Sequence, residues 1–93
     1  MKDAAEYGEQ LLDLIEQAID GNLNREEFER LLRRTVYTSL ESTFRRGAKI
    51  PEGDNMFPNE RIALEGILTN HETSINRMTD ELYRAIELQR LTR

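Results

Sequence analysis

The chain has 93 residues, of which 38% are hydrophobic and 33% are charged, and its net charge is −5. A chain this short builds one core, so we expect a single helical domain over residues 1–93. The absence of cysteine excludes disulfides, thiolate catalysis and cysteine-based zinc sites. No apolar stretch reaches the ~18 residues of a membrane span, and the charged start does not resemble a signal peptide. We therefore expect no membrane partner and a cytoplasmic location.

Charge is distributed unevenly along the chain. The net charge is −7 over residues 1–29, +5 over 30–49, −4 over 50–72 and +1 over 73–93. Such segregation predicts separate acidic and basic surfaces, each able to attract a protein of opposite charge. The overall acidity repels phosphates and argues against a nucleic-acid partner.

The first predicted helix spans about residues 4–19. Asp3 and Glu6 have the spacing of a capping box, and Gly21 suits the left-handed position that ends a helix. Apolar residues recur at helical spacing on one face, and acids occupy the other. The acidic face comprises Glu6, Glu9, Asp13, Glu16 and Asp20. We expect it to be a solvated surface or, alternatively, a binding site for a basic protein.

The second predicted helix spans about residues 25–46. Asn24 and Glu27 form a second capping box, and Leu23 and Phe28 have the spacing of a hydrophobic staple. The short connection to the first helix predicts an antiparallel hairpin. We expect Gly47 to end this helix, since glycine commonly follows the last helical residue.

A loop over residues 47–58 and a third helix over about 59–91 complete the expected fold. Pro51, Gly53 and Pro58 exclude regular helix from the loop. The third helix carries a heptad-like seam, which predicts shallow packing in an all-α three-helix bundle. Its polar centre leaves two alternatives, a continuous helix or one broken near Thr73. The seam comprises Leu64, Leu68, His71, Ile75, Met78, Leu82, Ala85 and Gln89.

The residue types and their spacing predict neither a metal site nor a catalytic site. Residues 20–28 imitate the second half of a calcium-binding loop, but loop position 3 would be Ala18, which has no ligand oxygen. The single histidine, His71, cannot form the paired sites of helical di-iron proteins, and its place on the seam favours a packed core or interface histidine over a pH sensor. No nucleophile–base pair or phosphate-binding loop is present. We expect neither enzyme activity nor a cofactor.

Two surfaces are candidates for binding a protein partner. The first is a basic stripe on the second helix that comprises Arg30, Arg34 and Arg45. Glu26 and Glu41 lie four residues before Arg30 and Arg45, and we expect each to form an ion pair with its arginine. The second is the end of the third helix, which we expect to extend beyond the other helices. Its candidate interface comprises Leu82, Tyr83, Ile86 and Leu88, which self-association or a partner would cover unless the chain itself does.

The order of these elements resembles a helical segment of tailed-phage minor head, or head-morphogenesis, proteins. The resemblance rests on the turn Asp20-Gly21-Asn22-Leu23-Asn24-Arg25-Glu26-Glu27-Phe28, the helix end Phe44-Arg45-Arg46-Gly47 and the leucine-rich helix from Ile62 to Leu82. The chain lacks the aromatic pair expected in the third helix and the larger body of such proteins. The resemblance implies a structural role, with a virion as a second expected location, and transfers no functional residue.

Three functions follow as hypotheses. The first is a non-enzymatic structural or protein-interaction module of phage origin, acting as a homo-oligomer or with another protein. The second is a small acidic regulatory or inhibitory protein that binds a basic surface through residues 4–19. The third is a nucleic-acid-associated helical subunit.

Overall fold

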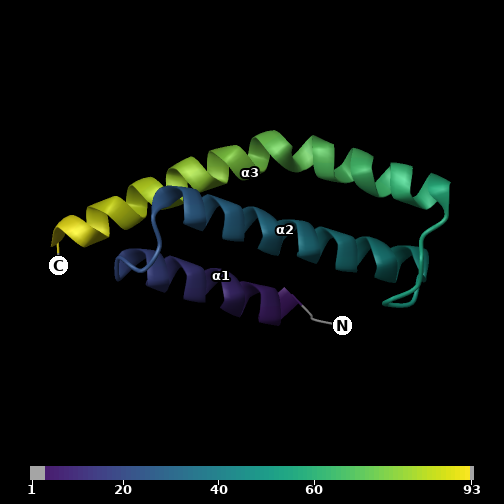
Figure 1. Ribbon diagram of the computed structural model, residues 1–93, viewed down its shortest axis with the longest axis horizontal. Coiled ribbons are helices and arrows are strands. Elements are labelled where there is room, and N and C mark those ends of the chain that lie inside the picture. The colour runs from purple at the N-terminus through teal and green to yellow at the C-terminus, as the bar shows by residue number, and fades with distance from the viewer. Residues whose placement is uncertain (1–3, 93) are drawn as a thin grey trace.

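Three helices that all contact one another form the protein in the computed structural model, which describes residues 4–92 (Figure 1). Helix α1 spans Ala4–Ile19, α2 spans Arg25–Ala48 and α3 spans Pro58–Thr92. The prediction of an all-α three-helix bundle is therefore confirmed. The expected capping residue Asp3 lies outside the described residues.

The turn between α1 and α2 has the geometry that its sequence predicts. Gly21 adopts a φ of 85°, in the left-handed region that glycine enters without a Cβ clash. The Asn24 side chain accepts a 2.8 Å hydrogen bond from the Glu27 amide, and the Asn24 amide donates a 3.1 Å bond to the Glu27 carboxylate. Leu23 and Phe28, the two residues of the staple, both join the core. Local sequence alone thus fixes this antiparallel turn.

Replacing Asn24 with alanine is expected to lower the free energy of unfolding by about 1 kcal/mol, because the Glu27 amide loses its acceptor. Chemical denaturation followed by circular dichroism measures this change. Asn22 lies in the same turn outside the capping box and provides the control, Asn22→Ala. An equal loss in both variants would contradict a specific capping role.

Helix α2 continues past Gly47, so the prediction that this glycine ends the helix is wrong. Lys49 takes the left-handed capping conformation instead, with a φ of 59°, and Ile50 donates a 2.9 Å backbone bond to Arg45. The Ile50 side chain is buried. Because the chain must turn at Lys49, two residues after Gly47, to bury Ile50, the helix ends there and not at Gly47. The connection to α3 is correspondingly shorter than predicted and spans residues 49–57.

Helix α3 is continuous, without a break near Thr73, and it bows away from the other two helices along its length (Figure 1). Pro58 occupies its first turn, where a missing amide hydrogen costs nothing. Glu60 accepts a 2.8 Å bond from the Phe57 amide and so satisfies one free donor at the helix start. The curvature resembles that of long helices whose convex side faces solvent.

Many covered positions of α3 recur every eleven residues, although Leu68, Ile75 and Leu82 also keep the predicted spacing of seven. Eleven residues make three turns of a nearly ideal α-helix, whereas a heptad repeat drifts by roughly 20° per repeat. The predicted heptad seam is therefore wrong in its details, since His71, Ala85 and Gln89 are all exposed. Buried or half-buried positions eleven residues apart are Leu64, Ile75 and Ile86; Leu68, Thr79 and Arg90; Ile67 and Met78; and Glu72 and Tyr83.

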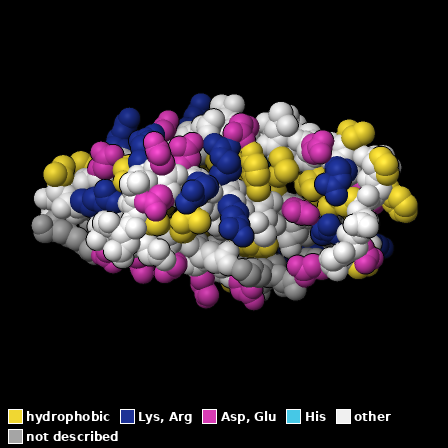
Figure 2. All heavy atoms as spheres, in the orientation of Figure 1, with side chains coloured by type: hydrophobic (Ala, Val, Ile, Leu, Met, Phe, Trp, Pro, Cys, Tyr) yellow, Lys and Arg dark blue, Asp and Glu magenta, His cyan; other side chains and the backbone are white. Residues whose placement is uncertain are grey.

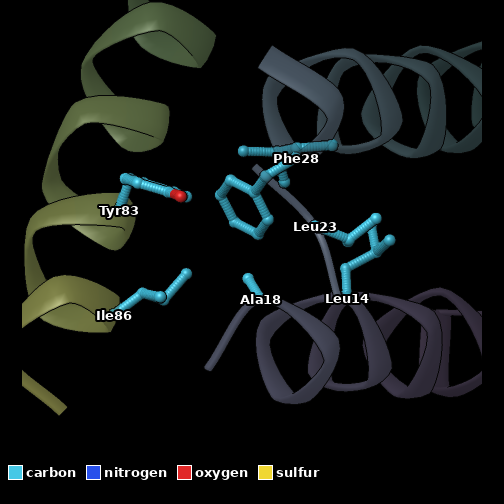
Figure 3. Close-up of a cluster of buried hydrophobic side chains, with 7 residues drawn as sticks. Leu14, Ala18, Leu23, Phe28, Tyr83 and Ile86 are labelled. Atoms are coloured by element: carbon cyan, nitrogen blue, oxygen red, sulfur yellow. The ribbon is translucent and has the colours of Figure 1, made fainter. Parts of the chain in front are cut away.

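The main core lies at the end of the bundle where α1 turns into α2 (Figure 3). Phe28 points into the space between the three helices and is fully buried. Its ring lies 5.7 Å from that of Tyr83, at a tilt of 48°. The cluster comprises Leu14, Ala18, Leu23, Phe28, Leu32, Tyr83 and Ile86.

Helix α1 runs parallel to α3 and covers only one half of it (Figure 1). The end of α1 lies beside the end of α3, since Arg90 donates to the Ala18 carbonyl. The start of α1 reaches the middle of α2, where the Tyr7 hydroxyl donates a 3.3 Å bond to the Thr38 carbonyl. The first half of α3 consequently packs against α2 without α1. The prediction that Leu82, Tyr83 and Ile86 lie on an uncovered end of α3 is wrong, because α1 runs in the same direction as α3 and its end packs beside them. Only the last residues of α3 extend past α1 (Figure 1).

Candidate protein-interaction surfaces

The predicted apolar interface at the end of α3 is mostly part of the core. Tyr83 and Ile86 are only 5% and 2% exposed, and Leu82 packs half-buried against the core cluster. These three residues therefore do not lie on a free surface, contrary to expectation. Leu88 differs from them and is 59% exposed.

Apolar side chains are exposed at both ends of α3. Within residues 4–92, five large hydrophobic side chains are exposed, and only Leu12 lies away from these ends. Phe57 and Ile62, at the start of the helix, form what we call the N-terminal apolar pair. Leu88 and Leu91 form the C-terminal apolar pair. The two pairs lie at opposite ends of a molecule that is 49 Å long (Figure 1).

Three of these four residues are not among the interface residues that the sequence predicts. The sequence predicts only that Phe57 belongs to the loop over residues 47–58, whereas in the structure its side chain is 73% exposed. Ile62 and Leu91 lie outside both the predicted seam and the predicted interface, and they also fall outside the eleven-residue series that α3 buries. Sorting the apolar residues of α3 by an eleven-residue period would have separated covered from uncovered positions.

The basic stripe on α2 retains two of its three predicted members. Arg30 and Arg34 are exposed one turn apart. Figure 2 shows several basic side chains along the middle of the molecule. Among the described residues no ion pair joins Glu26 to Arg30, whereas the predicted Glu41–Arg45 pair forms at 3.4 Å. The stripe is therefore short and more open than expected.

Arg45 serves the fold rather than a docking surface, which corrects its predicted role. Its side chain is only 14% exposed. The guanidinium donates hydrogen bonds to the carbonyls of Pro51 and Asp54, at 3.2 and 2.9 Å, in addition to its contact with Glu41. Arginine suits this position because its several donors can bind carbonyls and a carboxylate together. Arg45 thus holds the 49–57 connection against α2.

A polar cluster joins α2 to α3 near the level at which α1 begins. Arg33 and the Tyr37 hydroxyl donate to the two carboxylate oxygens of Glu72, and Arg33 also donates a 2.7 Å bond to Asn76. The hydrogen bond from Tyr37, followed by the bond from Arg33, lowers the pKa of Glu72 below its ordinary value of 4.5. The same bond to Glu72, together with burial, raises the pKa of Tyr37. The cluster therefore favours an ionised Glu72.

Protonation of Glu72 is expected to weaken the contact between α2 and α3. A carboxylate with a lowered folded pKa stabilises the fold above its unfolded pKa, and this stability is lost as the pH falls through the folded pKa. We therefore expect Glu72→Gln to lower the melting temperature at pH 7 and to reduce its decline below pH 4.5. Thermal melts from pH 3 to 7 measure both effects. Glu65→Gln, two helical turns earlier on α3, is the control and should change neither the melting temperature at pH 7 nor its decline at low pH.

Arg90 connects the end of α3 to the turn after α1. Its guanidinium donates to the carbonyls of Ala18 and Leu23, at 2.7 and 2.9 Å, and to the Tyr83 hydroxyl at 3.1 Å. It also lies 5.4 Å from the centre of the Tyr83 ring, and Arg25 lies 5.7 Å from the same centre. Arg90 thus supplies a donor to the Leu23 carbonyl and a further donor to the Ala18 carbonyl, which also accepts a 3.1 Å bond from the Gly21 amide.

The surface of the described residues has several open hollows. The one over the first half of α3 has a volume of about 440 Å³ and is lined by Tyr37, Glu65, Leu68, Thr69 and Glu72. His71 is exposed, and its Nδ1 lies 2.8 Å from the carbonyl of Ile67 in its own helix. Within residues 4–92, no group of three acids or histidines is arranged to hold a metal ion.

No described helix is both long enough and apolar enough to cross a membrane. Comparison of the chain with protein-family models, with curated proteins and with solved structures gave no match. The candidate surfaces are therefore interpreted from their own chemistry, and they consist of the two apolar pairs of α3 and the stripe of Arg30 and Arg34.

Proposed function

We propose that the protein is a non-enzymatic structural module that binds protein through the exposed apolar pairs of α3. The distribution of large hydrophobic side chains supports this proposal. Four of them lie exposed at the two ends of one helix, although the same helix buries its own regular series. Exposing each leucine, isoleucine or phenylalanine to water forgoes roughly 1.5–3 kcal/mol of burial, so a contact that covers these ends is favourable.

The remaining chemistry agrees with a binding role rather than turnover. The chain contains no cysteine and one histidine, and that histidine contacts its own helix instead of a serine, threonine or carboxylate. The perturbed carboxylate Glu72 is held ionised by Tyr37 and Arg33, an arrangement typical of a structural contact between helices. Resemblance to phage head-morphogenesis proteins favours virion assembly as the setting.

Site-specific photocrosslinking tests this proposal. A photoreactive phenylalanine analogue placed at Phe57 or Leu91 in cells that make the protein is expected to give discrete crosslinked bands. The analogue placed at Glu16, an exposed position on α1, provides the matched control and should give none. Equal crosslinking at all three positions, or none at Phe57 and Leu91, would contradict binding through the ends of α3.

A second candidate function rests on the acidic face of α1. Glu9, Asp13 and Glu16 are exposed, and they follow one another around one side of the helix. Such a face attracts a basic protein surface and would suit a regulatory or inhibitory role. The triple variant Glu9→Gln, Asp13→Asn and Glu16→Gln should then release any partner captured by the wild type. Unchanged binding by this variant would eliminate this candidate.

A further inference from the structure

We propose that the partner of each end of α3 is the opposite end of α3 in a second copy of this chain. This inference rests on the proposed function and names its partner. The C-terminal apolar pair, Leu88 and Leu91, would dock on the N-terminal apolar pair, Phe57 and Ile62, of the next molecule. The two pairs are similar in size and exposure, so each offers the other a surface of matching chemistry.

The charges beside the two pairs are complementary. Glu65 lies one turn after Ile62, and Arg84 lies one turn before Leu88. Both side chains are exposed, and neither forms an ion pair among the described residues. Arg61 and Glu87 are also exposed beside these pairs, so each end of α3 presents an apolar pair with one acid and one base that the other end can complement.

The order of these residues requires the two helix ends to run antiparallel where they meet. In that arrangement Leu91 lies opposite Phe57, Leu88 opposite Ile62 and Arg84 opposite Glu65. A parallel overlap would instead place Arg84 near Phe57 and Leu91 near Glu65, which pairs charges with apolar groups. Apolar and ionic complementarity thus select the same orientation.

The shape of α3 determines how many copies assemble. Its convex side faces away from α1 and α2, so two such helices that touch at one end diverge along their length (Figure 1). The second pair of ends then stays free and accepts another copy. Because the contact is between unlike surfaces and does not close on itself, it generates open chains rather than a closed dimer.

Sedimentation velocity across a concentration series provides the first test. The contact is small and must offset the entropy of association, so we expect weak assembly that requires concentrations approaching about 1 mM. The average mass of the wild type should rise beyond twice the monomer mass of 10.9 kDa. A constant monomer mass, or a mass that levels off at the dimer, would overturn the proposal.

Variants identify the surfaces. Ile62→Gln and Leu91→Gln each alter one side of every contact, so each variant alone should remain monomeric, whereas Leu12→Gln, at the exposed hydrophobic residue away from both ends, should leave assembly unchanged. A mixture of Ile62→Gln with Leu91→Gln retains one intact contact and should stop at the dimer. Circular dichroism checks that each variant remains folded. Equal loss in Leu12→Gln would overturn the assignment.

A charge exchange tests the orientation. Glu65→Arg and Arg84→Glu should each weaken assembly several-fold at low salt, and the double variant should restore it. Failure of the double variant to recover would contradict the antiparallel contact. If the mass remains monomeric while Phe57 and Leu91 still crosslink to a different protein, self-association fails and the proposed binding function stands.

Discussion

Replacing Phe28 with alanine is expected to lower the free energy of unfolding by about 3–5 kcal/mol, the usual cost of removing a buried phenylalanine side chain. Phe28 is fully buried and extends from α2 toward both other helices (Figure 3). Its removal would leave a cavity beside Tyr83 and Ala18, where all three helices meet. Urea denaturation followed by circular dichroism measures the loss.

Phe57 provides a matched control for Phe28. Both changes remove the same side chain, but Phe57 is exposed, so Phe57→Ala should alter stability by no more than about 0.5 kcal/mol. A domain of this size is typically stable by about 5–15 kcal/mol, so the Phe28 variant should lose a large part of its stability. Similar effects in the two variants would show that Phe28 is not the centre of the core.

Local sequence predicted the turn between α1 and α2 because its determinants are near neighbours. The capping box of Asn24 and Glu27 and the positive φ of Gly21 require only a few consecutive residues. The end of α2 could not be predicted in the same way. Gly47 suits a helix end, but the distant packing of Ile50 places the turn at Lys49 instead.

The candidate interface was predicted less well than the fold because exposure depends on how helices are placed relative to one another. Tyr83 and Leu88 are both apolar residues near the end of α3, yet one faces α2 and the other faces solvent. A heptad period could not separate them, whereas the eleven-residue period of the folded helix does. The short length of α1, and its contact with the end of α3 through Arg90, then decide which half of α3 is covered.

The role of Arg45 shows the same limitation for charged residues. Its spacing from Arg34 fits a surface stripe, and Glu41 forms the ion pair that the sequence predicts. Nothing local indicates that the 49–57 connection folds over the guanidinium and offers the carbonyls of Pro51 and Asp54 as acceptors. Arg45 therefore stabilises the fold through contacts with the backbone of the 49–57 connection, and does not form part of a docking surface as its spacing predicts.

Replacing Arg90 with alanine is expected to lower the free energy of unfolding by about 1.5–3 kcal/mol, because hydrogen bonds from a charged donor to partly buried acceptors are lost. The change removes the donors to the carbonyls of Ala18 and Leu23 and the contact with the Tyr83 ring. Urea denaturation measures the total loss. Hydrogen exchange should locate it, with faster exchange in the last turn of α1 and the last turns of α3.

Two further variants separate the geometry of Arg90 from its charge. Arg84→Ala removes an exposed arginine of the same helix that forms no ion pair among the described residues, and it should cost no more than about 0.5 kcal/mol. Arg90→Lys keeps the charge near the negative end of α1 but loses the planar fork that reaches two carbonyls and a hydroxyl. We therefore expect the lysine variant to recover only part of the lost stability. Full recovery by lysine would mean that charge alone, rather than the fork of hydrogen bonds, attaches α3 to α1.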